Sequence, residues 1–146
     1  MIIRKMTPED TLQAAQIEAL SITPPWSQQA FLDALKQDTL MLVAAEDEEG
    51  KLLGYVNMYL AFEEGEITNV ATHPAFRGQR IARRLMEETI RRAGEKGVER
   101  IVLEVRASNA AAIHLYETCG FRELGIRRNF YEQPREDARI MELRIC

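Results

Sequence analysis

The sequence predicts a single α/β domain, with a mixed sheet that carries helices on its faces. A chain of 146 residues, of which 46% are hydrophobic, has the size of one globular domain and enough apolar side chains for one continuous core. Strand-type and helix-type patterns follow one another in the order strand, two helices, three strands, helix, strand, helix, two strands. We find no repeat, linker or low-complexity segment in the sequence, and we therefore expect one domain over residues 1–146.

Two helices are expected after the first strand. Thr7 suits a helix cap, and Pro8 lacks the N–H group that a first helical turn leaves unpaired. We expect this helix to reach about Leu20. The segment 24–27, Pro-Pro-Trp-Ser, then breaks the chain, and Ser27 can cap a short second helix. This break is a candidate loop on the substrate side.

Three strands are expected at about 40–45, 52–60 and 66–72. The acidic stretch 46–51, which contains a glycine, suits a solvated hairpin tip. The third strand should end at His73, because the proline after it lacks a ladder donor and restrains the residue before it. We therefore interpret His73 as a strand-end residue and not as a catalyst.

The second half predicts a helix, a strand, a helix and two closing strands. Gly94 and Gly97 mark the end of the first of these helices, and Gly120 marks the end of the second. The apolar strand is short and is typical of a strand covered on both faces. These elements are expected at about 81–93, 101–105, 108–119, 121–126 and 138–145.

The bulk properties exclude several classes of protein. The 23 acidic and 19 basic residues give a net charge of -4, so no global charge favours a nucleic-acid partner. No apolar run approaches the roughly 20 residues of a membrane span, and the first residues lack a secretory pattern. We expect no membrane partner and a cytoplasmic location.

Two cysteines, Cys119 and Cys146, are present, and neither has a second Cys or His at metal-ligand spacing. We therefore expect no metal site and no disulfide. Cys119 could be a nucleophile, but it follows a helical apolar stripe, where a free cysteine is usually a small buried side chain. We favour the packing role for Cys119.

The turn at 77–82 has the composition of an anion site. It lies between a strand and a helix N-terminus, where free backbone N–H groups can bind a pyrophosphate. Gly78 and Ala82 are small enough to let backbone approach a phosphate, and several arginines around them supply positive charge. An ordinary turn with a solvated basic face explains the same residues equally well.

Glu104 and Tyr116 are the candidate catalytic residues. A carboxylate within the apolar run 101–105 is costly to bury unless it is paired or borders a wet cleft. Strand alternation places Glu104 opposite Leu103 and Val105, so an edge position that reaches solvent or an arginine is an equal alternative. Tyr116 shares a helical face with Ile113, which by itself favours a place in the core.

Two patterns show a resemblance to a known superfamily. The turn from Arg77 to Ala82 resembles the pyrophosphate loop of GNAT acetyltransferases, which reads Gln or Arg, two residues, Gly, one residue, then Gly or Ala. Arg80 stands where that family most often has Gly. The segment 103–121 is similar to bacterial ribosomal-protein-alanine N-acetyltransferases, and shorter matches at 25–27 and 127–138 extend the likeness over nearly the whole chain.

The resemblance implies a GNAT-like fold with a mostly antiparallel, twisted sheet of about seven strands and four helices. It also implies transfer of an acetyl group from acetyl-coenzyme A (acetyl-CoA), with Glu104 as general base and Tyr116 as general acid. Strand backbone at 70–72 should bond the pantetheine arm of the cofactor. The cofactor-binding residues that it implies are Val70, Ala71, Thr72, Arg77, Gly78, Gln79, Arg80, Ile81, Ala82, Arg83 and Asn109.

The acceptor implied by the resemblance is the N-terminal α-amine of a protein, in particular a small-subunit ribosomal protein that begins with Ala. An α-amine has a pKa of roughly 8, whereas a Lys side chain has one of roughly 10.4 and is harder to deprotonate. Trp26 and Tyr131 could line the peptide groove as rigid aromatics or could simply pack. A Lys or small-molecule acceptor, and a non-catalytic acyl-CoA sensor, are the competing functions.

Overall fold

A seven-stranded sheet organises the computed structural model, which describes residues 1–22, 24–78 and 80–145. Its strand order is β1-β2-β3-β4-β5-β7-β6, with β4 and β5 parallel and the other neighbours antiparallel. This confirms the predicted mixed, mostly antiparallel sheet. The strands are β1 (Ile2–Lys5), β2 (Leu40–Glu46), β3 (Leu52–Ala61), β4 (Glu64–Thr72), β5 (Arg100–Arg106), β6 (Arg122–Glu132) and β7 (Arg135–Arg144).

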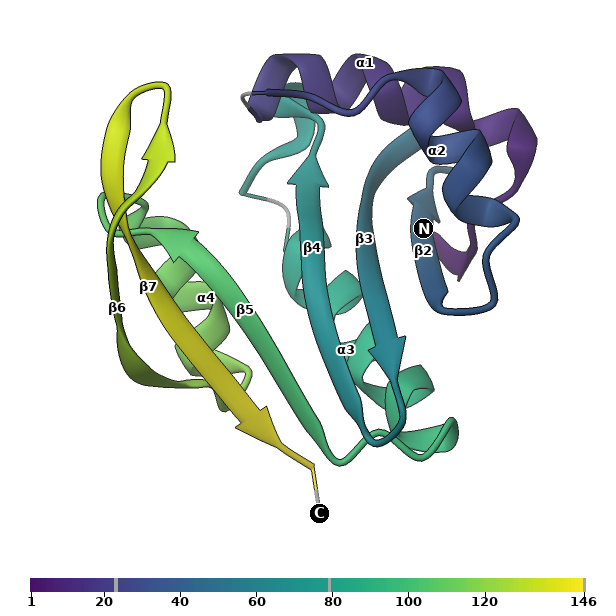
Figure 1. Ribbon diagram of the computed structural model, residues 1–146. Coiled ribbons are helices and arrows are strands. Elements are labelled where there is room, and N and C mark those ends of the chain that lie inside the picture. Colours follow the sequence, from purple (N-terminus) through teal and green to yellow (C-terminus); the bar gives the residue numbers. More distant parts are fainter. Residues whose placement is uncertain (23, 79, 146) are drawn as a thin grey trace.

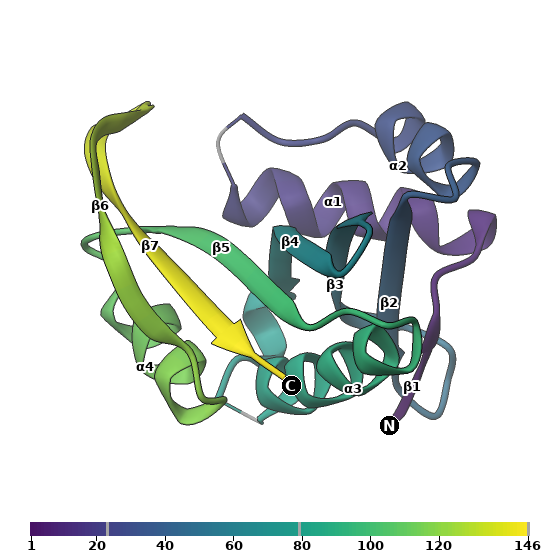
Figure 2. The same ribbon diagram turned by 60° about the horizontal axis from the view of Figure 1, so that its bottom comes forward.

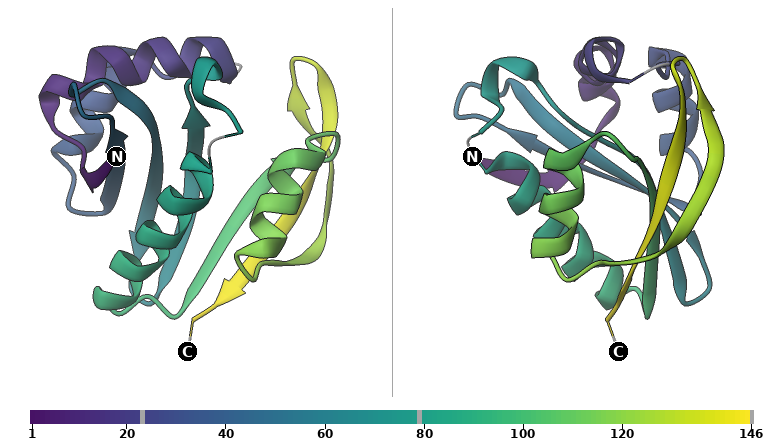
Figure 3. Two further views of the ribbon diagram at one scale, coloured as in Figure 1. Left: turned by 180° about the vertical axis from the view of Figure 1, so that it is seen from behind. Right: turned by 90° about the vertical axis from the view of Figure 1, so that its left-hand side faces the viewer.

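The helices cover both faces of this sheet. Figure 2 shows α1 and α2 on one face of β2, β3 and β4, with α3 on the other. Seen from behind in Figure 3, α3 and α4 lie side by side in front of the strands. The bounds are α1 (Thr11–Ser21), α2 (Gln28–Leu35), α3 (Ile81–Glu95) and α4 (Ala110–Thr118), with short 3-10 turns η1 (Pro8–Asp10) and η2 (Pro74–Phe76).

Strand alternation divides the apolar core into two layers. In β2, Val43 and Ala45 pack toward α3, while Leu42 and Ala44 pack toward α1 and α2. Every residue from Met41 to Ala45 is buried, as expected for a strand covered on both faces. The central strands are therefore the fixed frame against which the outer elements are positioned.

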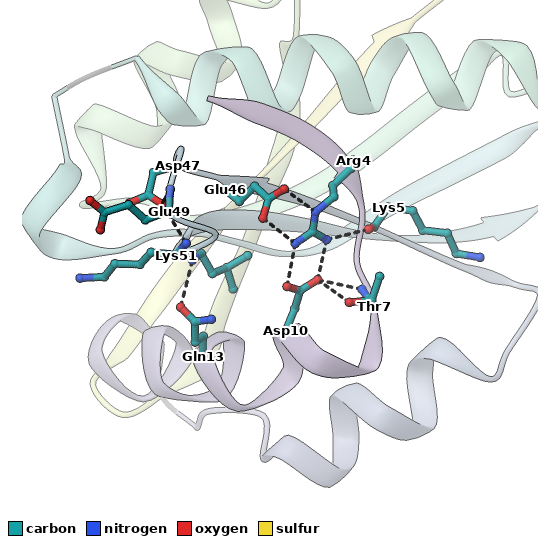
Figure 4. Close-up of polar contacts among 10 residues, drawn as sticks. Arg4, Lys5, Thr7, Asp10, Gln13, Glu46, Asp47, Glu49 and Lys51 are labelled. Carbon is teal, nitrogen blue, oxygen red and sulfur yellow. Dashed lines mark hydrogen bonds and ion pairs between the residues drawn. The ribbon is translucent and has the colours of Figure 1, made fainter.

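A charged cluster, drawn in Figure 4, fixes the start of α1. The Arg4 guanidinium donates to both oxygens of Asp10, at 2.7 and 2.9 Å, and its Nε lies 3.1 Å from the Glu46 carboxylate. The Asp10 carboxylate also accepts the Thr7 N–H at 2.8 Å, which closes the 3-10 turn η1. Because of this turn, the α-helix begins at Thr11 and not next to Thr7 as predicted.

The strand β5 corrects one prediction. Its buried residues alternate with half-buried ones, so Leu103 and Val105 lie in the core layer beneath α3 and α4 while Glu104 faces the other way. The predicted cover on both faces is wrong here, because α1 and α2 lie over β2, β3 and β4 and do not extend to β5. The predicted alternation that sets Glu104 apart from its neighbours is confirmed.

The closing hairpin is longer than predicted. The strands β6 and β7 pair antiparallel from Arg122↔Glu142 to Glu132↔Arg135, whereas the sequence predicted strands only near 121–126 and 138–145. Irregular register around Asn129, which has φ 54°, conceals the strand pattern in the sequence. This extension places Tyr131 on a strand.

The parallel pair β4 and β5 separates part of the way along. Pairing runs from Glu64↔Arg100 to Ile67↔Leu103 and then stops, although both strands continue. A β-bulge at Thr68, where Asn69 pairs with Asn57 but Ile67 pairs with Met58, coincides with that point. Figure 1 shows the two strands close together at their lower ends and diverging upward.

Candidate active site

A cavity of about 300 Å³ occupies the gap that β4 and β5 leave between them. Ile67 to Val70 line it from β4, Leu103 to Arg106 line it from β5, and Ser21 and Ile22 border it from the end of α1. Five residues that the sequence singled out also line it, namely Val70, Glu104, Asn109, Tyr116 and Tyr131. Separate segments of the chain thus bring these groups into one space.

The β4 backbone presents peptide groups to this gap that have no hydrogen-bond partner within the described ranges. The His73 N–H donates to the Leu53 carbonyl at 2.8 Å, and antiparallel bonding alternates from one residue to the next. Ala71 therefore bonds toward β3, whereas the peptide groups of Val70 and Thr72 point to the side that β5 has left. The splay required by a pantetheine contact is present, with Val70 and Thr72 rather than Ala71 facing it.

Glu104 reaches the gap with one oxygen paired and the other free. Its Oε1 accepts from Arg127 Nη1 at 3.1 Å. Its Oε2 is buried and has no hydrogen-bond partner in the part of the chain that the structure describes. An oxygen of this kind costs free energy unless something binds to it. The carboxylate is therefore placed to accept a proton or a hydrogen bond from a ligand in the cavity.

Tyr116 enters the same space from the other side of the sheet. It lies on α4, is only 7% exposed, and its ring packs at 5.9 Å from that of Phe121. Burial, followed by the neighbouring Tyr131 and Cys119, raises the pKa of Tyr116 above that of an ordinary phenol. Its hydroxyl therefore keeps its proton at neutral pH and can donate it.

Tyr131 lies close to both of these groups. Burial, then the Glu104 charge, raises the pKa of the Tyr131 phenol, while Arg106 opposes the shift. The Arg106 guanidinium stacks on the Tyr131 ring with its carbon 4.2 Å from the ring centroid. The ring is thus held at the wall of the cavity, where the sequence predicted a groove residue.

Asn109, which was predicted to contact the cofactor, also caps a helix. Its Oδ1 accepts from the Ala112 N–H at 3.1 Å and caps α4. The amide Nδ2 therefore remains as the donor for a ligand. Trp26, the other predicted groove residue, packs edge-on against Phe31 with ring centroids 5.2 Å apart and does not line the cavity.

The turn before α3 has the backbone of an anion site. Gly78 has φ 86° and Arg80 has φ 60°, which are conformations that favour glycine. Arg80 is the N-cap of α3 and makes no side-chain cap, so none of the described side chains occupies the first N–H groups of the helix. The family's usual glycine at this position thus has a backbone reason, and Arg80 adopts the same conformation with a side chain.

The side chains of this turn have varied surroundings. Arg77 donates to Ser21 Oγ at 3.2 Å, and Arg83 pairs with Glu87 at 3.1 Å. Ile81 is buried, so only its backbone can meet a ligand, and Ala82 is half-buried beside it. Gln79, also predicted to bind the cofactor, lies outside the described residues.

The remaining sequence interpretations concern residues away from the cavity. Burial raises the pKa of the Cys119 thiol, which packs against the core and is a poor nucleophile in that state. His73 Nδ1 accepts from the Ala75 N–H at 3.1 Å and caps η2. Within the described ranges, no cluster of His, Cys, Asp or Glu could hold a metal ion, and no helix is long and apolar enough to cross a membrane. Cys146 is not among the described residues.

A sheet that opens between parallel strands, with a turn of anion-site geometry at one strand end and a carboxylate and a phenol in the gap, has the features of an acyl-CoA-dependent acyltransferase. The chain belongs to the acetyltransferase (GNAT) family, whose model matches residues 7–121. It is an acetyl-CoA-dependent N-acetyltransferase, as the resemblance predicted.

Individual relatives cover nearly the whole chain. It is 38% identical over 145 residues to the [ribosomal protein bS18]-alanine N-acetyltransferase of Escherichia coli K12, covering 98% of this chain and 97% of that one. The Salmonella typhimurium enzyme of the same name is 38% identical over 138 residues, covering 93% of this chain and 92% of its own. The crystal structure of the Escherichia coli ribosomal-protein-S18-alanine N-acetyltransferase superposes with a TM-score of 0.89 at 36% identity, covering 99% of this chain and 93% of that one.

Several polar residues near the cavity were not found from the sequence. Asn57 and Asn69 are directly paired between β3 and β4 and are buried. Glu18 on α1 is fully buried and bonds to Asn69 and Tyr55. Asn57, a polar residue within the apolar run 52–60, was the one feature of the sequence that could have indicated this buried polar group. The partners of Glu18 are far apart in the sequence, so spacing could not reveal them.

Proposed function

We propose that this enzyme acetylates the N-terminal α-amine of a protein, with a ribosomal protein that begins with Ala as the acceptor. The observation that carries the proposal is the cavity where Glu104, with one free oxygen, and Tyr116 meet the open edge of β4. The bS18-alanine specificity named for the relatives supports the choice of acceptor. We further propose that the chain is a single N-acetyltransferase domain.

Glu104 acts as the general base. It removes a proton from the acceptor ammonium group, directly or through one water, and so frees the nitrogen lone pair. An α-amine has a pKa of roughly 8, so part of it is already unprotonated near neutral pH, whereas a Lys side chain at roughly 10.4 is almost fully protonated. The free Oε2 is the atom suited to this step, because Oε1 is bonded to Arg127.

Tyr116 acts as the general acid. Acetyl-CoA supplies the thioester, and the reaction forms an N–C bond and breaks the C–S bond. The nitrogen loses two protons on its way from ammonium to amide: Glu104 takes the first and passes it to solvent, and the second leaves as the tetrahedral intermediate collapses. The Tyr116 hydroxyl gives its proton to the departing sulfur and is then reprotonated from solvent, so the products are the acetylated peptide, the coenzyme A thiol and one proton. The raised pKa of Tyr116 keeps the phenol protonated until negative charge develops on that sulfur.

Acetyl-CoA fits the remainder of the site. The peptide groups of Val70 and Thr72 would bond its pantetheine arm, and the free Nδ2 of Asn109 would donate to it. The N–H groups at the start of α3, with Gly78 and Arg80, would hold the pyrophosphate. Arg80, at 60° in φ, already has the backbone conformation that the turn needs, so its side chain does not support the sensor alternative.

The experiment compares acceptors at saturating acetyl-CoA. We expect a peptide with an N-terminal Ala to gain one acetyl group, and an N-terminally blocked peptide with an internal Lys, a polyamine and an aminoglycoside to gain none at a comparable rate. Glu104→Gln and Tyr116→Phe should each lower kcat while binding acetyl-CoA normally. Preferred transfer to the Lys or the polyamine would overturn the proposed acceptor, and unchanged turnover in both variants would overturn the catalytic roles.

A further inference from the structure

A second carboxylate lies directly behind the cavity. Glu18 is fully buried on the face of the sheet that α1 covers. Its Oε1 accepts from the Tyr55 hydroxyl on β3, and its Oε2 accepts from Asn69 Nδ2 at 2.8 Å and from the Trp26 N–H at 3.1 Å. One side chain thus joins α1, β3, β4 and the segment 24–27.

The Glu18 contacts lead to the wall of the cavity. Asn69 lines the cavity, as do Ser21 and Ile22, which follow Glu18 by about one helical turn. The Glu18 carbonyl also accepts the Ile22 N–H at 2.9 Å, which fixes the end of α1. Because Glu18 accepts from Asn69, the amide nitrogen of Asn69 must face it and Oδ1 must face away.

The orientation of Glu104 assigns this wall to the acceptor. Glu104 faces away from the core layer under α3 and α4, and therefore toward the face that carries α1. The start of α3, whose first N–H groups suit an anion, lies on the opposite face, and the turn before it meets the α1 side only where Arg77 donates to Ser21 Oγ at 3.2 Å. An amine that gives its proton to Glu104 therefore approaches past Ser21, Ile22 and Asn69.

We propose that Glu18 is a positioning residue for the acceptor, holding Asn69 and the segment 24–27 in the arrangement that the acceptor requires. The inference rests on the proposed function, because it assigns the α1 side of the cavity to the peptide. Glu18 touches neither the thioester nor the reacting nitrogen. Its loss should therefore change the KM for the acceptor and leave the KM for acetyl-CoA unchanged.

The chain offers a matched control. Tyr55→Phe removes the donor on the core side of Glu18 and leaves the contacts to Asn69 and Trp26 in place. Glu18→Gln is the conservative variant, because its remaining oxygen can take the Oε2 position while its amide donates to the Tyr55 hydroxyl. Trp26 is the single tryptophan of the chain, so its fluorescence reports the segment 24–27 without any turnover.

We expect Glu18→Ala to raise the acceptor-peptide KM by about tenfold or more, with the acetyl-CoA KM within about twofold of wild type. Asn69→Ala should raise the acceptor KM in the same way, and Glu18→Gln should restore most of the loss. Trp26 emission in Glu18→Ala should shift to longer wavelength and become more sensitive to acrylamide. Tyr55→Phe should lower the melting temperature but keep the wild-type acceptor KM and Trp26 signal.

Equal changes in the acceptor KM and the acetyl-CoA KM would overturn the inference. It would also be overturned if Tyr55→Phe lost as much melting temperature as Glu18→Ala and raised the acceptor KM by the same factor. If Glu18→Ala does not fold, Asn69→Ala and Glu18→Gln carry the comparison, and a wild-type acceptor KM in Asn69→Ala would overturn it. A wild-type enzyme that acetylates no peptide would instead contradict the proposed function. In that case the fluorescence of the Glu18 and Tyr55 variants still decides whether Glu18 holds the segment.

Discussion

Glu18 and Glu104 are two carboxylates on either side of one cavity, and their surroundings differ. Glu18 is fully buried and receives three hydrogen bonds, from Tyr55, Asn69 and the backbone of Trp26. Glu104 receives one, from Arg127, and its buried Oε2 has no partner among the described residues. A carboxylate with every oxygen occupied fixes structure, whereas one with a free oxygen remains available for chemistry.

The largest effect should come from a variant in which the free Glu104 oxygen can no longer accept a proton. Glu104→Gln keeps the shape of the side chain but cannot accept a proton from the acceptor. We expect kcat/KM to fall by about 10²- to 10⁴-fold, which is the usual range for a general base. Steady-state kinetics with an N-terminal Ala peptide would measure it, and acetyl-CoA affinity by calorimetry is the control. A decrease of less than about threefold would remove Glu104 from the mechanism.

The cluster of Arg4, Asp10 and Glu46 (Figure 4) provides a fully paired carboxylate at the start of α1, whereas the end of α1 borders the cavity. Burial by itself would raise the pKa of Asp10, but the hydrogen bonds and charge of Arg4 and the Thr7 contacts outweigh it and lower the pKa below its usual value. A carboxylate with a lowered folded-state pKa contributes stability above its unfolded-state pKa of roughly 3.9, and loses it as pH falls through the folded-state value.

Asp10→Asn should therefore lower the free energy of unfolding by about 2 kcal/mol at pH 7. The difference from wild type should stay constant above about pH 5 and shrink below about pH 4 as the wild-type carboxylate becomes protonated. Urea denaturation from about pH 7 down to about pH 3 measures it, and kcat at pH 7 should remain that of wild type. A pH-independent difference would show that the ion pair is not its source.

The turn before α3 allows a test of backbone strain at Arg80. Arg80 adopts a φ of 60°, which costs a residue with a Cβ about 1 kcal/mol relative to glycine. Arg80→Gly should therefore be more stable than Arg80→Ala by about that amount, since both lose the side chain and only Gly loses the strain. Thermal unfolding compares them directly. Equal stability would mean that the turn relaxes in the variants.

The smallest effect should come from changing Arg127, the one partner of Glu104 among the described residues. The Arg127 side chain is 56% exposed, so solvent screens its pair with Glu104. Arg127→Gln should change the free energy of unfolding by less than about 1 kcal/mol. Denaturant unfolding with Arg139→Gln, which removes another exposed pair, provides the reference. A much larger loss would mean that Glu104 is as firmly held as Glu18, and the comparison between them would fail.

The sequence predicted the element order well, because the apolar periods of the central strands and of α3 are local signals. The resemblance identified the enzyme class, which the family match confirms. The roles of Glu104 and Tyr116 remain predictions, but the fold brings both to one cavity. The groove role predicted for Trp26 lacks this support, because its ring packs on Phe31.

Contacts between segments that are distant in the sequence could not be predicted from sequence patterns. Asn69 and Glu18 are 51 positions apart, and Tyr55 and Glu18 are 37 apart, so no spacing rule connects them. The gap between β4 and β5 opens where β4 has a bulge at Thr68, and this bulge carries no strong local signal in the sequence. The length of the β6–β7 hairpin was missed for a related reason, since its register is irregular between Arg127 and Tyr131.

The most direct test of the central claim uses one peptide that offers both amines, an N-terminal Ala and an internal Lys. After incubation with acetyl-CoA, fragmentation by mass spectrometry locates the acetyl group. We predict one acetyl group on the α-amine with wild-type enzyme and almost none with Glu104→Gln. Acetylation of the Lys, or equal α-amine acetylation by Glu104→Gln, would contradict the account.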